Sequence, residues 1–328
     1  DSLKLPYWFM NHEEMCEIFC SKGTNTTDAE RLILKDAIAE ARRQYMGENA
    51  KFVPNVDTPV PFRIQQCYKM IEEAMGRLEK PEGAQPYLRL LTRIDSLRND
   101  SRYAFMFQGI SITDNMVPVL QRILRRPVEG KPLCILNMAG VPAEVSDVVI
   151  SFVCRTIFAT GVWATDPKIA PVLLVCEEAH RYVPRDDAAA FAPTRKALAA
   201  IAKEGRKYGI SLGLITQRPS EISESILSQC GTLFALRMSN DKDQVFIKHA
   251  MPEGSDGFLK ILPTLRTQEC VVVGEGVEMP MRIKLDDLSP DRRPKSDTAD
   301  FAAAWKTGEG NPAELAQTVE NWRRQSKW

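Results

Sequence analysis

The sequence predicts an α/β protein with a mainly parallel sheet flanked by helices. From Pro132 onward, short apolar runs such as 172–176 alternate with helical patterns. Strands that alternate with helices of about 10–15 residues are typical of βαβ units. With 328 residues, 44% of them hydrophobic, the chain can form one large domain or two smaller ones. Its formal net charge of zero provides no overall basic field for nucleic acid, which leaves only contacts by a few residues.

Residues of about 12–126 are expected to form a helical insertion beside the sheet. Proline and glycine gather at 47–61, which indicates a loop. Helices are expected at 62–78, 85–99 and 115–126, with a short strand at 103–107. No catalytic motif is found in this region.

The second half of the chain is expected to supply the sheet. Strands are predicted at 133–137, 172–176, 210–216 and 232–237. The helices between and after them are predicted at 144–159, 194–207, 221–228, 241–249 and 255–261. Strands at 269–274 and 279–285, joined through Gly274-Glu-Gly276, indicate an edge hairpin.

The expected organisation is an α/β core over 1–288 and a C-terminal tail over 289–328. The tail is rich in proline and charge, and 312–324 is expected to be its final helix. Its tryptophans are Trp305, Trp322 and Trp328. They would dock either onto a neighbouring subunit or back onto their own domain.

The candidate site is centred on the stretch Pro171-Val-Leu-Leu-Val-Cys-Glu-Glu-Ala-His180. A short apolar run without alternation predicts a strand buried on both faces. Glu177 and Glu178 then lie at its carboxyl end, where open α/β sheets bind ligands. In a nucleotide hydrolase one such acid holds Mg²⁺, usually through water, and the next polarises the attacking water. The alternative is that both acids only begin the following segment.

Two further polar residues follow at positions suited to phosphate chemistry. Gln217 ends the next strand, so in a parallel sheet it lies at the same edge as Glu178. There it can contact a γ-phosphate or orient water, or it can simply precede a turn at Pro219. Arg206 ends the helix over 194–207 and is a candidate for stabilising transition-state charge. A solvated basic face is the alternative.

The eight cysteines form no Cys-x-x-Cys pair. Several lie in apolar runs, as buried thiols do in a reducing cytosol. His12, Cys16 and Cys20 share one helical face, but a metal site there lacks an evident fourth ligand. No long apolar span and no signal peptide are evident, so a cytoplasmic protein without a membrane partner is expected.

Four motifs together resemble the HerA branch of the HerA–FtsK ring ATPases, over roughly residues 1–288. They are Glu177-Glu178-Ala179-His180, Glu204-Gly-Arg-Lys-Tyr-Gly209, Thr216-Gln-Arg-Pro219 and Leu5-Pro-Tyr-Trp8. The resemblance implies a RecA-like fold in a homo-hexamer that uses ATP and Mg²⁺ to translocate double-stranded DNA through a central pore. It also implies a partner, either a nuclease or, in anti-phage systems, a sirtuin-like or other effector.

The same resemblance implies roles for the residues already singled out. Glu177 would serve the Mg²⁺ site, Glu178 would be the catalytic base and Gln217 the sensor. Arg206 would act as a finger on the neighbouring subunit. The basic residues expected to contact DNA follow the catalytic strand: Arg181, Arg185, Arg195 and Lys196.

One departure from the family pattern is serious. No Gly-x-x-x-x-Gly-Lys-[Ser/Thr] loop occurs, and Gly130-Lys131 is followed by Pro132. Without that loop a triphosphate has little to bind. Either the phosphate-loop segment precedes Asp1 in a longer polypeptide, or this chain does not hold ATP by itself. A ring scaffold with little turnover and a conjugation-type secretion ATPase therefore remain as alternatives.

Overall fold

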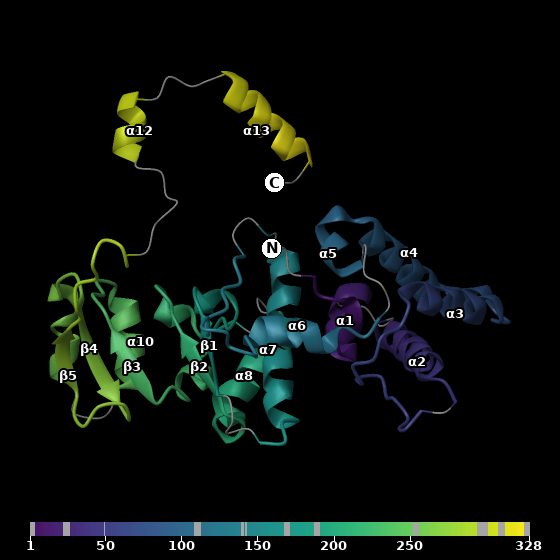
Figure 1. Ribbon diagram of the computed structural model, residues 1–328, viewed down its shortest axis with the longest axis horizontal. Helices are drawn as coiled ribbons and strands as arrows, with labels where there is room; N and C mark the ends of the chain where they lie inside the picture. The colour runs from purple at the N-terminus through teal and green to yellow at the C-terminus, as the bar shows by residue number, and fades with distance from the viewer. Residues whose placement is uncertain are drawn as a thin grey trace.

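The computed structural model describes residues 4–21, 27–48, 50–107, 113–138, 141, 143–166, 171–186, 191–251, 256–293, 301–307 and 312–324. Figure 1 shows the helices of the N-terminal part at one end, two parallel strands with their helices in the middle, and a second sheet at the other end. The N-terminal helices and the parallel strands share one hydrophobic core, and the second sheet has a core of its own. The larger extends from Leu5 to Ile226, and the smaller lies around Ala235 and Val271.

The N-terminal part is helical, as predicted. Its elements are η1 (Tyr7–Phe9), α1 (His12–Phe19), α2 (Thr27–Met46), α3 (Ile64–Gly76), η2 (Pro81–Ala84), α4 (Gln85–Asn99), η3 (Ser101–Tyr103), α5 (Ala104–Phe107) and α6 (Met116–Leu124). The predicted strand at 103–107 is wrong. Asp100 accepts a hydrogen bond from the Arg102 backbone N–H at 2.9 Å and so starts a turn. Tyr103 and Met106, three residues apart, then both reach the core on one helical side.

A buried arginine holds the segment that enters α1. Arg42 is fully buried and its Nη2 donates to the carbonyl oxygens of Trp8 and Met10, both at 3.1 Å. Its Nη1 donates to the carbonyl of Val56. The guanidinium therefore satisfies three backbone acceptors that have left water.

Glu14 ties α1 to α7 (Ala143–Val162). Its carboxylate is 2% exposed and accepts from Ser151 Oγ and Arg155 Nε, both at 2.9 Å. It also closes a capping box with Asn11 at the start of α1. A buried charge with partners on both sides fixes one orientation of the two helices.

Two parallel strands lie at the centre of the molecule: β1 (Val172–Cys176) and β2 (Ile210–Leu214). Their first residues are opposite each other, as are their last. Helix α8 (Ala192–Glu204) and the 3₁₀ turn η6 (Gly205–Tyr208) lead into β2. The predicted parallel βαβ arrangement is therefore confirmed here.

In the part of the chain that the structure describes, only one face of this strand pair is covered. Helices α7 and α8 pack on the side of Leu174 and Cys176. Leu173 and Val175 point to the opposite face and are 65% and 48% exposed. The expectation that β1 is buried on both faces is wrong, because the described chain supplies helices to one face only.

Helix α7 is apolar enough, by length and composition alone, to cross a membrane, and it is the one such helix among the described residues. The expectation that no such span occurs is therefore corrected. Its side chains, including Phe152 and Ile157, are buried in the larger core. This burial explains the composition, because a helix surrounded by protein is apolar on every side.

The predicted strand at 133–137 is also wrong. This segment has no strand partner in the part of the chain that the structure describes. Leu133 and Ile135 are 73% and 78% exposed. Apolar sequence alone does not make a strand without a neighbour to bond with.

The second sheet is antiparallel, in the order β3 (Thr232–Ala235), β4 (Glu269–Gly274) and β5 (Met281–Lys284). The predicted hairpin is confirmed by the pairing of β4 with β5. The strand predicted at 232–237 is expected in the parallel sheet, but β3, which forms there, pairs antiparallel with β4 instead. Helices α10 (Asp241–Ala250) and α11 (Asp256–Leu259) accompany this sheet and its core.

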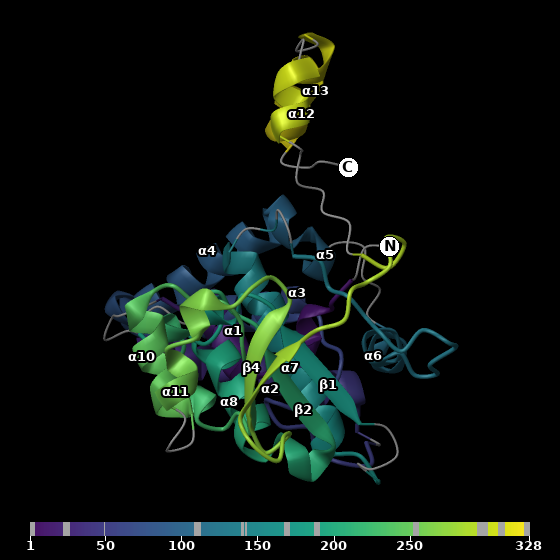
Figure 2. The ribbon, with the colours of Figure 1, turned by 90° about the vertical axis from the view of Figure 1, so that its left-hand side faces the viewer.

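The tail forms α12 (Phe301–Thr307) and α13 (Pro312–Arg324), which stand apart from the body in Figures 1 and 2. Helix α13 has no buried residue, and Trp305 and Trp322 are 78% and 75% exposed. Both side chains are therefore mostly exposed, and the surface on which the tail docks stays a prediction. Trp328 lies outside the described residues, and the domain boundary at 288 stays a prediction.

Candidate active site

The two acids follow β1 directly, and the backbone turns sharply there. Glu178 has φ 51° and ψ 44°, in the left-handed region that non-glycine residues seldom adopt. The turn is fixed on β2, because Ala179 N donates to the Ile215 carbonyl at 2.9 Å. Ile215 N in turn donates to the Cys176 carbonyl at 2.9 Å. Strained backbone held by surrounding bonds is common at functional sites.

The structure brings Gln217 to Glu178. Gln217 Nε2 donates to Glu178 Oε1 at 3.3 Å. The register explains this contact, because Cys176 and Leu214 end their strands side by side. The sequence-based expectation that both residues share one edge of the sheet is met. Their roles in catalysis stay predictions.

His180 also belongs to this cluster, although no role for it is evident from the sequence alone. Its Nδ1 lies 3.1 Å from Thr216 Oγ1 and 3.5 Å from Glu178 Oε2. Thr216 Oγ1 also accepts from the Arg218 backbone N–H at 3.0 Å. The 3₁₀ turn η4 (Ala179–Arg181) places the imidazole over the end of β2. Its position two residues after Glu178 was the signal that could have identified it.

Arg206 lies at the opposite edge of the sheet. It belongs to η6, just before Gly209, whose carbonyl accepts from Val172 N at 2.9 Å at the start of β1. The length of a five-residue strand, about 15 Å, therefore separates it from Glu178. Gly205 is required for this approach, because a Cβ there would meet the Ile210 carbonyl oxygen at 2.5 Å. The structure thus does not bring Arg206 to the acids of its own chain.

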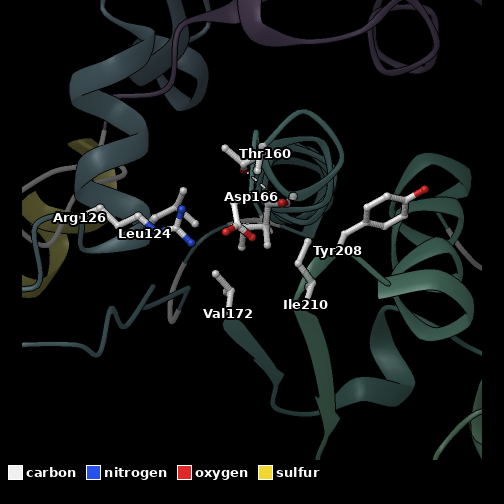
Figure 3. Close-up of a pocket in the computed structure, with 10 residues that line it drawn as sticks. Leu124, Arg126, Thr160, Asp166, Val172, Tyr208 and Ile210 are labelled. Atoms are coloured by element: carbon white, nitrogen blue, oxygen red, sulfur yellow. Dashed lines mark hydrogen bonds between the residues drawn. The ribbon is translucent and has the colours of Figure 1, made fainter. Parts of the chain in front are cut away.

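A small cavity lies at this same far edge (Figure 3). It encloses about 20 Å³, room for about one water molecule. Thr160 of α7, Val172 of β1 and Ile210 of β2 line it, with Arg126 and Asp166 at its side. The cavity is too small for a nucleotide and is remote from Glu178.

The residues expected to contact DNA lie on two segments, in and just after η4 and on α8. Arg181 is exposed in η4. Arg185 is paired with Glu224 of α9 (Glu224–Leu227) at 2.8 Å, and its guanidinium lies over Phe246.

The other two residues lie on α8. Arg195 is partly buried, and Lys196 pairs with Glu13 of α1. A DNA role for all four stays a prediction, and Arg185 and Lys196 would have to exchange carboxylate partners for phosphate.

The side chains at the acid edge suit a magnesium nucleotide. Carboxylate and amide oxygens are hard donors, the kind Mg²⁺ and its bound waters prefer. Glu177 is exposed and Glu178 is partly exposed, so both are open to a ligand. The described residues contain no group of three or more His, Cys, Asp or Glu that could hold a metal by itself. This finding gives no support to a metal site at His12, and Mg²⁺ at Glu177 would need phosphate and water as its other ligands.

Known proteins resemble this chain in both sequence and fold. Residues 1–157 match the family model described as Helicase HerA, central domain. The probable DNA double-strand break repair helicase HerA of Methanocaldococcus jannaschii is 37% identical over 116 residues, which are 35% of this chain and 22% of that protein. The DNA double-strand break repair helicase HerA of Saccharolobus solfataricus is 30% identical over 236 residues, 69% of this chain and 44% of that protein. The chain thus spans less than half the length of these relatives.

A solved structure agrees on the fold. VirB4 of Thermoanaerobacter pseudethanolicus superposes with a TM-score of 0.56 over 85% of this chain and 68% of that one, at 17% identity. The fold, with acids at the carboxyl edge of parallel strands, is a RecA-like α/β fold. The sequence matches are more specific. In sequence the chain is similar to HerA-like members of the HerA–FtsK ATPase family.

Proposed function

We propose that this chain is part of the motor of a hexameric, ATP-driven DNA translocase or helicase of the HerA type. One observation carries the proposal: the left-handed turn at Glu178 directs its carboxylate to Gln217, 3.3 Å away. A nucleotide hydrolase needs an acid and a water-orienting amide side by side at the end of adjacent strands. The family relationship supports the same chemistry.

Each residue of the site has a separate role in the proposed hydrolysis of ATP. Bound ATP supplies the phosphoryl group, with Mg²⁺ to neutralise its charge. Glu177 would hold the ion. Glu178 accepts the proton of the attacking water, which the Gln217 amide orients. Arg206 acts on the site of a neighbouring subunit, a role supported by its distance from the acids of its own chain.

ATP hydrolysis is proposed for a polypeptide that also carries a phosphate-binding loop, since residues 1–328 contain no such motif. The uncovered face of β1, with Leu173 and Val175 exposed, supports the packing of a further element beside this site. The chain is proposed to have two parts. The first is the RecA-like core over 1–288, with its helical insertion at about 12–126, and the second is the tail over 289–328.

The proposed setting follows the family. Double-stranded DNA passes through the central pore of a cytoplasmic homo-hexamer, and the motor serves a nuclease or an anti-phage effector such as a sirtuin-like protein. A ring scaffold with little turnover is the second candidate, which the missing phosphate-binding motif favours. The mass of the native polypeptide separates the two. A mass near 36.9 kDa favours the scaffold, and a clearly larger one favours the motor.

The decisive experiment is Glu178→Gln in the complete polypeptide. Turnover of ATP should fall by about 10²-fold or more, because the base is lost while the shape is kept. Binding of a fluorescent ATP analogue should persist. Glu204→Gln is the matched control, since Glu204 is exposed at the end of α8 and forms an ion pair with Lys207 at 3.9 Å. Equal turnover in the two variants would remove Glu178 from the mechanism.

A further inference from the structure

Helix α1 carries a histidine and two thiols in line along one side. His12 Nε2 lies 3.2 Å from Cys16 Sγ, and Cys20 follows one helical turn later, near enough for each thiol to shift the pKa of the other. Both thiols are free and buried, with Cys16 3% and Cys20 7% exposed, and His12 beside them is partly exposed. The proposed ATPase chemistry uses none of them.

The surroundings make the two thiols unequal. The hydrogen bond from Cys20 and then the His12 imidazole lower the pKa of Cys16 to about 6, and Arg31 acts in the same direction. The pKa of Cys20 is raised, first by its hydrogen bond to Cys16 and then by burial. Glu30 adds to that rise. At neutral pH the pair therefore holds one thiolate and one thiol, the arrangement of an attacking and a resolving cysteine.

We propose that Cys16 and Cys20 form a peroxide-sensitive dithiol, with Cys16 as the reacting thiolate and Cys20 as the resolving thiol. The Cys16 sulfur attacks hydrogen peroxide, a sulfur–oxygen bond forms and the oxygen–oxygen bond breaks. The leaving hydroxide takes a proton and becomes water. Cys20 then displaces the hydroxyl of the sulfenic acid, giving a disulfide and a second water. Two thiols are oxidised and one peroxide is reduced.

The backbone allows this bridge. Residues four apart on a helix are separated by about 6 Å along the axis, inside the Cα range of disulfides. Cys20 is the residue that ends α1 and has already left helical geometry, with φ −90° and ψ 155°. Its sulfur can therefore approach Cys16 without breaking a turn in the middle of the helix.

The modified helix is tied to the strands that carry the acids. Glu14 of α1 bonds Arg155 of α7, and Glu13 pairs with Lys196 of α8. Both α7 and α8 pack under β1 and β2. Oxidation of Cys16 would therefore act on a helix in contact with the framework of the site.

A second thiol pair in the same chain provides an internal control. Cys154 of α7 and Cys176 of β1 are also buried, and each thiol shifts the pKa of the other. Among the described residues, Cys154 alone lowers the pKa of Cys176, with no imidazole or guanidinium beside it. This pair should react far more slowly with peroxide.

The test is to treat the chain with hydrogen peroxide, alkylate the remaining thiols after denaturation and map them by mass spectrometry. We expect the peptides of Cys16 and Cys20 to lose two hydrogens together and to escape alkylation, while Cys154 and Cys176 stay alkylated. Cys20→Ser should trap a sulfenic acid on Cys16 that reacts with dimedone. Cys154→Ser should leave the result unchanged.

A second variant keeps the test independent of the bridge. His12→Asn removes the imidazole and should slow the reaction of Cys16 with peroxide several-fold while circular dichroism stays unchanged. The proposal is overturned if Cys16 reacts no faster than Cys154, or if His12→Asn reacts at the rate of the native chain.

Discussion

Replacing Arg42 by methionine tests how the segment entering α1 is held. The variant keeps the length of the side chain but removes the donors to the carbonyls of Trp8, Met10 and Val56. Hydrogen bonds from a charged donor contribute about 2 kcal/mol each, so the three contribute about 6 kcal/mol. Burial opposes this gain, since it lowers the pKa of Arg42 from 12.5 to about 10.

That pKa change corresponds to about 3 kcal/mol against the charged form, with burial as its largest cause. The net loss in Arg42→Met is therefore about 3 kcal/mol, a large part of the ~5–15 kcal/mol that stabilises a typical domain. We would measure it by urea unfolding, followed by circular dichroism of the helices. The midpoint should fall markedly with little change in slope.

Arg43→Met is the matched control on the next residue of α2. Arg43 is exposed and makes one surface ion pair with Glu40 at 2.8 Å. Such pairs contribute about 0–1 kcal/mol. If Arg42→Met lost no more stability than Arg43→Met, the three carbonyls would be satisfied in another way, and the reasoning from buried acceptors would be wrong.

Three further predictions concern the ring and the second sheet. In the complete polypeptide, Arg206→Ala should lose ATP turnover and regain part of it in rings mixed with subunits inactivated at the catalytic acid; absence of rescue would indicate a role within its own subunit. Deleting 290–328 should weaken the hexamer if the exposed tail docks on a neighbour, and an unchanged mass-photometry profile would exclude that docking. The Arg266 backbone N–H and then the Arg282 guanidinium lower the pKa of Glu269. The ionised Glu269 therefore stabilises the fold at neutral pH, and this stabilisation is lost as the pH falls through the lowered pKa. Glu269→Gln should therefore lose less thermal stability on acidification than the native chain. The same dependence of melting temperature on pH in both proteins would contradict this role of Glu269.

The position of Glu178 beside Gln217 could be predicted from the sequence because it depends on short segments of the chain. An apolar run that ends in Glu177 and Glu178 specifies a strand and its exposed end. The next strand, ending before Gln217, must be parallel if a helix intervenes, and the register then brings the two ends together. The contact of 3.3 Å between Gln217 and Glu178 follows from those two facts.

Features that depend on distant neighbours could not be predicted. Leu133 and Ile135 have strand-like sequence but no strand beside them in the described chain. Leu173 and Val175 belong to an apolar run, although one side of that run is uncovered. Burial depends on what packs against a residue, and no local pattern contains that information.

Arg206 is a different case, since its position could have been worked out. A helix between two parallel strands must return the chain to the opposite edge, so a residue at the end of α8 cannot lie beside Glu178. The structure shows that separation directly.

The uncovered strands also have a consequence for handling the protein. Among the described strands, β2 pairs only with β1, and β3 pairs only with β4, so each keeps one row of backbone donors and acceptors unpaired. Phe234 of β3 is 57% exposed, like Leu173 and Val175 of β1. Unpaired edges beside exposed apolar side chains are the usual starting point of aggregation. Residues 1–328 expressed alone should precipitate readily and bind chaperones. Co-expression with a segment that pairs with the unpaired strand edges should raise the yield of soluble protein, whether or not it changes ATP turnover.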